Sequence, residues 1–142
     1  FIWKKITSPL LSNSSKVIDL ISVDGDVHHI FPKEFLKQNK ITDKSQYNQV
    51  ANYAYLDTVV NISIGKKAPS DYFASALEQC STGNITVGTI TNENVFWSNL
   101  EVNCIPTDVL NMGGVDYPDF LRKRRILMAK KIKDYYYSLW LL

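Results

Sequence analysis

The alternation of apolar and polar residues predicts two short strands followed by a helix in the first half of the chain. The apolar stretch "VHHIF" stops at a proline, so we expect a strand over residues 27–31 that ends before Pro32. The next residues, "KEFLKQNK", have the spacing of one or two helical turns. The stretch "SQYNQVANYAYLDTVVN" predicts a short helix, a second strand near residues 53–56, and a helix that begins at Asp57 or Thr58, either of which could cap it. The predicted order is therefore strand, long loop, strand and helix.

The second half of the chain is predicted to contain two more helices separated by a polar segment. In "APSDYFASALEQ", Ser70 is expected to cap a helix whose apolar positions follow it. After Cys80 the chain becomes polar, and "GNITVGTITNENVFW" has a strand-like pattern that we interpret as a structural insertion. The closing segment predicts one long amphipathic helix over about residues 118–140, because apolar residues recur there at helical spacing. These apolar residues are Leu121, Met128, Ile132, Tyr135 and Leu139.

The length and composition indicate a single folded, globular domain. The chain has 142 residues, of which 45% are hydrophobic and 12% aromatic, enough to bury a sizeable core. We therefore expect residues 1–142 to form a single domain. Lysine and arginine total 16 against 14 acidic residues, which gives a formal net charge of +2. Such a balance does not require a polyanionic partner, so any nucleic-acid surface has to be local.

The two cysteines and the apolar segments bear on the cellular compartment. Cys80 and Cys104 could form one disulfide, but their spacing fits no zinc pattern, and we interpret them as reduced. No stretch approaches the roughly twenty apolar residues that span a bilayer, and the first residues lack the order of a secretory signal. We therefore expect a cytoplasmic protein with no membrane partner. Because the chain opens on Phe1 rather than on methionine, we also expect it to be the C-terminal part of a longer protein.

Both histidines of the chain are adjacent, and this pair is the centre of the candidate site. His28 and His29 lie at the end of the first predicted strand. Asn52 lies at the entrance of the second strand, and Asn61 lies on the helix that follows. A hairpin packed on a helix can bring these places into one cleft. Taken alone, histidines at a strand end are more often structural than catalytic, and Asn52 could equally cap a turn. The ordered set of four polar residues makes a metal or catalytic site the stronger interpretation.

Three segments, "HHIFPKEFL", "QVANYAYLD" and "NISIGKKAPSDY", resemble the HNH nuclease motif and its ββα-metal fold. Residues 26–73 are similar to the C-terminal HNH domain of GmrSD-type restriction endonucleases, and "DFLRKRRILMAKKIKDYYYSL" is similar to the helix that ends such proteins. Residues 79–115 match only loosely. The resemblance implies an α+β fold with a ββα-metal (HNH, His-Me finger) core over residues 23–78, wrapped by additional helices and followed by the long C-terminal helix.

The resemblance also implies a role for each residue of the set. His29 matches the general base that takes a proton from the attacking water, a task that suits the imidazole group at neutral pH. Asn52 matches the middle asparagine, whose amide is expected to bridge backbone groups and so fix the orientation of the base. His28 and Asn61 match the two metal ligands. The ion is expected to be divalent, with Mg²⁺ or Mn²⁺ favoured, and Ni²⁺ or Zn²⁺ open because His28 replaces a carboxylate.

The activity implied by the resemblance is metal-dependent hydrolysis of DNA phosphodiester bonds, as the cleavage module of an anti-phage restriction system. A separate N-terminal nucleotide-handling domain of the same protein would then be a partner. Lys66, Lys67, Arg122 and Arg125 are candidates for contacting nucleic acid, although such charges more often only solvate a turn or a helix face. Two alternatives stay open, namely an HNH scaffold that binds DNA or a protein without cleaving, and an RNase that uses the same site.

Overall fold

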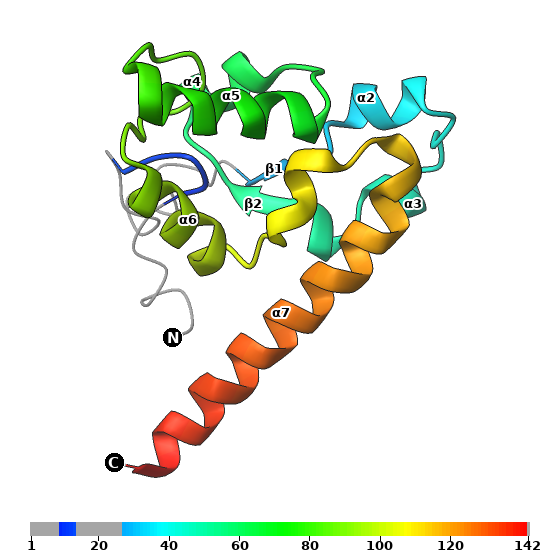
Figure 1. Cartoon of the computed structure of the whole chain (residues 1–142). Coiled ribbons are helices and arrows are strands. Elements are labelled where there is room, and N and C mark those ends of the chain that lie inside the picture. Colours follow the sequence, from blue (N-terminus) through cyan, green and yellow to red (C-terminus); the bar gives the residue numbers. More distant parts are fainter. Residues whose placement is uncertain (1–8, 14–26, 142) are drawn as a thin grey trace.

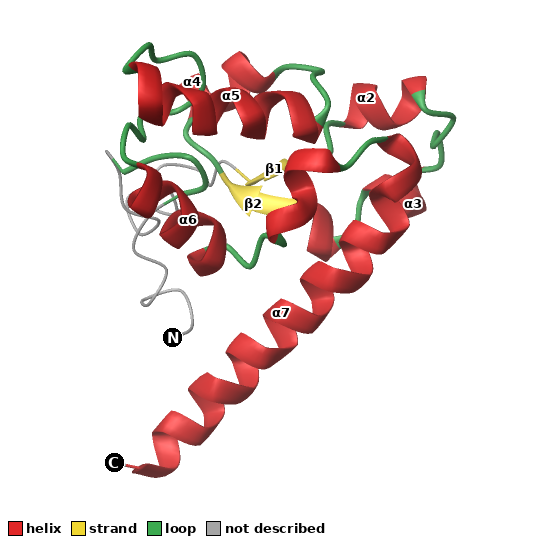
Figure 2. Cartoon of the chain, viewed as in Figure 1, coloured by secondary structure: helices red, strands yellow, loops and turns green. Residues whose placement is uncertain are grey.

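The computed structural model describes residues 9–13 and 27–141, which form an α+β fold that is mostly helical (Figure 1 and Figure 2). The expected α+β class is thereby confirmed. The first part of the expected core motif, residues 23–26, lies outside the described residues. In chain order the elements are β1 (Val27–His29), α2 (Lys33–Gln38), α3 (Lys44–Tyr47), the 3₁₀ helix η2 (Val50–Asn52), β2 (Tyr53–Tyr55), α4 (Thr58–Ile64), α5 (Pro69–Thr82), α6 (Glu93–Val102), the 3₁₀ helices η3 (Thr107–Asn111) and η4 (Gly114–Asp116), α7 (Tyr117–Ser138) and the 3₁₀ helix η5 (Leu139–Leu141).

The two strands form an antiparallel hairpin with a long, partly helical connection. The register places His28 opposite Ala54 and His29 opposite Tyr53. The connection contains α2 and α3, which confirms the helical turns predicted between the strands. The first strand is shorter than the predicted residues 27–31, because the chain leaves the sheet after His29. Figure 1 shows the hairpin near the middle of the molecule, with α2, α4 and α5 above it in this view.

Helices α4 and α5 follow the hairpin, and their ends are set by proline and glycine. Asp57 occupies the N-cap position of α4, and Gly65 ends the helix with a φ of 55°. Glycine adopts this left-handed conformation without steric strain. Helix α5 begins at Pro69, with Ala68 as its N-cap residue. The prediction that Ser70 caps this helix is wrong, because Pro69 has no N–H to satisfy and is favoured at the first helical position.

The polar segment after α5 is a loop and a helix rather than the predicted strand. Residues 83–92, all of them described, contain no strand. Helix α6 follows at once, and the Asn92 side chain caps it by accepting a hydrogen bond from the N–H of Val95 (3.1 Å). The loop is held by the buried amide of Gln79 in α5. This amide donates to the Val87 carbonyl (2.8 Å) and accepts from the Val87 N–H (3.1 Å).

The predicted C-terminal helix is confirmed as α7, which ends at Ser138. Phe120 and Leu121 in its first turns are buried, whereas Tyr136 near its end and Trp140 in η5 are 54% and 73% exposed. Figure 1 shows this later part projecting away from the other helices. Among the described residues, no helix combines the length and the apolar composition that crossing a bilayer requires.

The core lies directly behind the histidine pair. Phe31, two residues after His29, is fully buried, with its ring centroid 4.8 Å from that of Phe120 and 5.2 Å from that of Tyr117. Burying a phenylalanine side chain stabilises a fold by roughly 1.5–3 kcal/mol. The side chain of Phe31 therefore anchors the end of β1 to the start of α7. Both cysteines are free, as expected, and the Cys104 side chain is buried at the edge of this core.

Gly88 lets the loop after α5 approach the described N-terminal residues. Its φ is 71°, and a β-carbon at this position would collide with the backbone carbonyl of Leu11. We expect Gly88→Ala to lower the free energy of unfolding by about 3 kcal/mol, because it combines left-handed strain with a clash between two backbone segments. Urea unfolding followed by circular dichroism measures the loss.

Gly83 supplies a matched control for this prediction. Its φ is 74°, but an added β-carbon would meet no atom within 4 Å. Gly83→Ala is therefore expected to cost only the conformational strain, about 1 kcal/mol. Equal losses in the two variants would show that the Gly88 contact with Leu11 contributes nothing.

Candidate active site

The paired histidines lie where β1 ends and the chain turns into the core. Both side chains are half-buried, and both line the same cleft. Neighbouring residues in a regular strand point to opposite faces, so two adjacent histidines can share a cleft only where the strand stops. The strand stops at His29, and Pro32 lines the cleft immediately before α2 begins.

Asn52 holds the backbone of this turn from within. Its side chain is fully buried, and its Oδ1 atom accepts a hydrogen bond from the N–H of Phe31 (2.8 Å). Its Nδ2 atom donates to the carbonyls of Phe31 (3.2 Å) and Tyr47 (3.1 Å). One amide therefore ties the segment after the histidines to the end of α3. The bridging of backbone groups expected of this asparagine is present, and its contribution to catalysis stays a prediction.

The residue between His29 and Phe31 is held equally firmly. Ile30 donates its N–H to the Asn52 carbonyl (2.8 Å), and its own carbonyl accepts a hydrogen bond from the Tyr72 hydroxyl (2.6 Å). Burial raises the pKa of Tyr72 well above its usual value, so this hydroxyl keeps its proton and remains a donor. The two backbone units that follow His29 thus have partners for both N–H and C=O groups, which fixes the position from which His29 projects.

Helix α4 brings Asn61 to the same cleft. Val60 and Ile64 are buried and anchor one face of the helix in the core. Asn61 and Gly65, which are one turn apart and so lie on one side of the helix, both line the cleft. The hairpin and the helix thus bring together His28 and Asn61, the two predicted metal ligands, although they are distant in the sequence.

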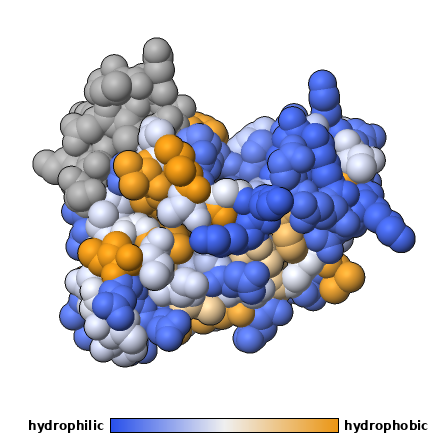
Figure 3. All heavy atoms as spheres, turned by 90° about the horizontal axis from the view of Figure 1, so that it is seen from above, coloured by the Kyte–Doolittle hydropathy of each residue, from blue (hydrophilic) through white to orange (hydrophobic). Residues whose placement is uncertain are grey.

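The cleft has a volume of about 470 Å³ and is open to solvent. Its lining consists of His28, His29, Pro32, Lys33, Glu34, Asn61, Gly65 and Lys66. Figure 3 views the molecule from the side of α2, α4 and α5, and the surface on the right of this view is largely hydrophilic. A wide, polar cleft of this kind suits an extended charged substrate better than a small apolar ligand.

The charges at the cleft come from α2 and from the turn after α4. Lys33 and Lys66 are exposed cations that line it, and Glu34 is its carboxylate. Glu34 forms an ion pair with Lys37 (3.1 Å), in which both side chains are exposed. Exposed pairs of this type are weak, so the Glu34 carboxylate can exchange this partner for another cation.

Of the four basic residues predicted to contact nucleic acid, only Lys66 lines the cleft in the part of the chain that the structure describes. Lys67 is exposed, and its Nζ atom donates to the carbonyl of Ser63 at 2.8 Å. That contact closes the last turn of α4 and directs the Lys67 ammonium along the helix. The structure therefore separates two lysines that are adjacent in the sequence.

The two arginines lie on α7, apart from the cleft lining. Arg122 donates through Nε and Nη2 to Asp119 (3.0 and 2.7 Å), and hydrogen bonds from Lys123 and Arg122 lower the pKa of Asp119. Arg125 donates to the side-chain oxygen of Gln49 (2.9 Å). Arg125 thus reaches the loop between α3 and η2, whereas Arg122 is engaged within its own helix.

The residues that line the cleft fit a divalent ion that retains several water ligands. Within the described residues no three His, Cys, Asp or Glu side chains form a metal-binding group, but the predicted site also uses an asparagine oxygen. The His28 imidazole and the Asn61 amide oxygen supply two ligands of types that Mn²⁺, Ni²⁺ and Zn²⁺ accept. Glu34 adds a carboxylate to the same cleft, and Mg²⁺ prefers such hard oxygen ligands.

Sequence reasoning did not single out three residues of this site. Lys33 and Glu34 reach the cleft because α2 begins directly after Pro32, and their position four to five residues after the histidines was the available signal. Asn48 is the third. Its Oδ1 atom lies 3.0 Å from Nε2 of His29, across 19 residues of sequence, and no local pattern marks such a contact.

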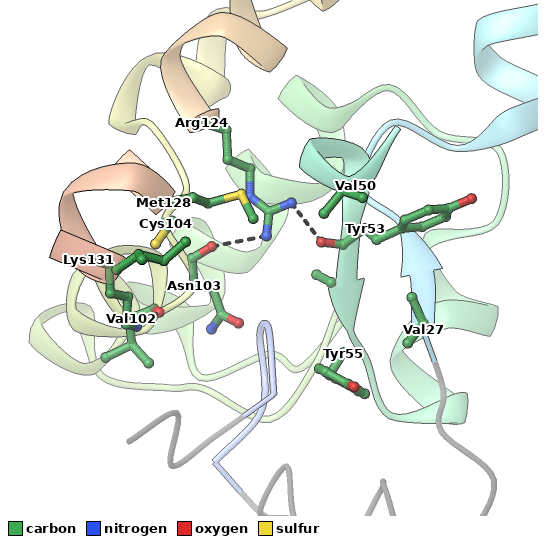
Figure 4. A pocket seen from close by; sticks show the side chains of 12 residues that line it. Val27, Val50, Tyr53, Tyr55, Val102, Asn103, Cys104, Arg124, Met128 and Lys131 are labelled. Carbon is green, nitrogen blue, oxygen red and sulfur yellow. Dashed lines mark hydrogen bonds between the residues drawn. The ribbon is translucent and has the colours of Figure 1, made fainter. Parts of the chain in front are cut away.

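A second pocket, of about 320 Å³, lies between the hairpin, the end of α6 and α7, and its lining is mostly apolar (Figure 4). Arg124 reaches it from α7 and is only 5% exposed. Its guanidinium donates to the carbonyls of Ala51 (2.9 Å), Tyr53 (2.6 Å) and Asn103 (3.2 Å). Burial lowers the pKa of Arg124 to about 10. These hydrogen bonds hold the residues on both sides of Asn52, so Arg124 supports the candidate site from outside.

No protein-family model, no curated protein and no solved structure matches this chain. A functional assignment therefore depends on the residues of the cleft and on their geometry.

Proposed function

We propose that this chain is a metal-dependent endonuclease of the HNH type, with a ββα-metal core built from β1, β2 and α4. Its substrate is DNA, and it acts as the cleavage module of an anti-phage restriction system, as the resemblance to GmrSD-type enzymes implies. One observation carries the proposal. His28, His29 and Asn61 line a single cleft, and Asn52 clamps the backbone that presents the histidines.

His29 is the general base of the proposed reaction. Its half-buried ring lines the cleft and is held against the ring of Tyr53, with the two centroids 4.9 Å apart. Hydrolysis of a phosphodiester needs a water molecule that is deprotonated as it attacks phosphorus, and a positioned imidazole accelerates such a step by about 10²- to 10⁴-fold. The backbone clamp at Asn52 keeps the imidazole in place, so little reorganisation is needed at the moment of proton transfer.

His28 and Asn61 are the residues that would hold the divalent ion. Such an ion, when bound, would polarise the scissile phosphate and neutralise charge on the departing oxygen. Lys33 and Lys66, which flank the cleft, contact the neighbouring phosphates of the strand. Arg125 places a positive charge beside the loop that contacts His29, and the other α7 charges add to long-range attraction of the polyanion.

Cleavage of supercoiled plasmid tests this proposal directly. We expect the protein to nick plasmid DNA with at least one of Mg²⁺, Mn²⁺, Ni²⁺ or Zn²⁺, and to stop when the ion is chelated. Asn61→Ala is expected to lower the rate by roughly 10- to 100-fold, because a ligand of the ion is lost. The matched control is Asn84→Ala, which removes an exposed amide from the loop after α5 and should leave the rate unchanged.

Four results would count against the proposal. Nicking that persists in chelator, or in Asn61→Ala at the wild-type rate, would exclude the assigned metal site. Binding of DNA without turnover under all four ions would favour a non-cleaving scaffold. Cleavage of RNA alone, tested with an RNA and a DNA strand of the same sequence, would keep the site and change the substrate.

A further inference from the structure

The loop between α3 and η2 presents an amide group to the ring of His29. Asn48 follows the last residue of α3, and its Oδ1 atom lies 3.0 Å from Nε2 of His29. The backbone that leads into Asn48 is fixed by two hydrogen bonds. The N–H of Asn48 donates to the carbonyl of Lys44 (2.9 Å), and the preceding Tyr47 is buried, with its carbonyl bound by Asn52.

We infer that Asn48 is a positioning residue that fixes the tautomer and the ring orientation of His29, an inference that rests on the proposed role of His29 as the base. An amide oxygen can only accept a hydrogen bond, so its contact with Nε2 requires a proton on that nitrogen. A neutral imidazole carries one ring proton. The Nδ1 atom is therefore left with the lone pair and is the atom that accepts a proton.

The same contact selects one of the two ring orientations. Turning the imidazole by half a turn would place a carbon, rather than Nε2, opposite the Asn48 oxygen and would lose the hydrogen bond. The ring of Tyr53, with its centroid 4.9 Å away, and that of Tyr47, 6.0 Å away, restrict the ring plane but do not distinguish these two orientations. The Asn48 oxygen distinguishes the two orientations, because it contacts a single ring nitrogen.

Asn48 can keep its hydrogen bond to His29 throughout the proton transfer. The O–H bond of the attacking water breaks, and its proton forms a bond with Nδ1 of His29. The resulting hydroxide bonds to phosphorus while the bond from phosphorus to the departing oxygen breaks, and that oxygen takes a proton from solvent. The ring then carries one positive charge, with Nε2–H still donating to Asn48. Hydrogen bonds to a charged donor are stronger than those to a neutral one, so the amide oxygen stabilises the ring more after the transfer than before it.

The first test reads the ring directly and needs no turnover. Nitrogen-15 NMR of protein labelled in histidine shows only two rings, and the His28→Gln variant assigns them. We expect His29 in the wild type to be in the Nε2–H tautomer, with an Nε2–H signal that exchanges slowly with water. In Asn48→Ala this signal should broaden or disappear, while Asn48→Asp, which keeps an acceptor, should retain it. Gln46→Ala is the control, because Gln46 is an exposed residue of α3, two positions before Asn48.

The second test measures turnover with plasmid DNA and the preferred ion. We expect Asn48→Ala to lower kcat by about tenfold with little change in KM, and Asn48→Asp to restore most of the rate. A proton on Nδ1 of wild-type His29, or an unchanged Nε2–H signal in Asn48→Ala, would overturn the inference even if the protein cleaves DNA. Conversely, the expected spectra from a protein that never cleaves would support the Asn48 contact and would refute the proposed endonuclease activity.

Discussion

Replacing His29 by alanine is expected to lower the rate of phosphodiester cleavage by at least about a hundredfold, the contribution of a positioned general base. The loss should lie in the chemical step, because His29 holds no ligand position in the proposed site. The side chain is half-buried, and its contacts are with Asn48 and the rings of Tyr47 and Tyr53. We therefore expect the fold to survive, with a loss of about 1 kcal/mol in the free energy of unfolding. Single-turnover cleavage of plasmid and thermal unfolding followed by circular dichroism measure the two effects.

The neighbouring histidine provides the control for this experiment. His28→Ala removes the same side chain one residue earlier, from the proposed metal ligand rather than from the base. Its rate should recover in part as the metal concentration is raised, because weaker binding of the ion is offset by mass action. The rate of His29→Ala should not recover. If both variants respond to added metal in the same way, or if His29→Ala cleaves at the wild-type rate, the two roles are assigned wrongly.

The hairpin and the helix after it were predictable because their signals are local. Pro32 directly precedes α2, Gly65 ends α4, and Asp57 precedes the first turn of that helix. Each signal acts through the backbone conformation of one or two residues and does not depend on distant contacts. The same holds for α7, whose apolar spacing is regular and whose first turn contains a proline.

The loop before α6 differs from the predicted strand because a side chain of the preceding helix, α5, determines its conformation. The β-branched residues in 83–92 favour a strand on their own. In the structure, Gln79 supplies to this loop the hydrogen bonds that a partner strand would have supplied. Asn92, which caps α6, is a local signal for a helix start, but it lies within a run of polar and β-branched residues that favours a strand.

Some residues of the candidate site could likewise be predicted from local patterns, and others could not. His28, His29, Asn52 and Asn61 could be proposed because their order along two strands and a helix follows a recognisable pattern. Asn48 could not be, because its contact with His29 depends on how a loop without regular structure folds back on the strand end. The sequence does not indicate which basic residues face the cleft, because an exposed lysine or arginine side chain can extend in many directions. In the structure Lys66 lines the cleft, whereas Arg122 forms hydrogen bonds with Asp119 of its own helix.

Replacing Asn52 by alanine is expected to lower the free energy of unfolding by about 3 kcal/mol, a large part of the stability of a domain of this size. The variant loses three side-chain hydrogen bonds and leaves the N–H of Phe31 and the carbonyl of Tyr47 buried without this partner. Each buried polar group that loses its partner costs about 1–3 kcal/mol. Urea unfolding measures the change. Asn94→Ala, at an exposed asparagine of α6, is the control and should change stability by less than about 0.5 kcal/mol.

Asn52→Asp separates the geometry of this side chain from its hydrogen-bonding pattern. An aspartate fills the same space and can still accept from the N–H of Phe31, but an ionised carboxylate would face the carbonyls of Phe31 and Tyr47. Burial beside two carbonyl oxygens raises the pKa of such a carboxyl in the folded state above its unfolded value of about 3.9. A protonated carboxyl can donate to one of the two carbonyls, so the stability of the variant relative to the wild type should be highest below about pH 4. Its stability should then fall as the pH rises through the raised folded pKa. A variant whose stability, relative to the wild type, does not depend on pH would show that the Asn52 amide does not donate to these carbonyls, and the account of how the histidine turn is held would have to change.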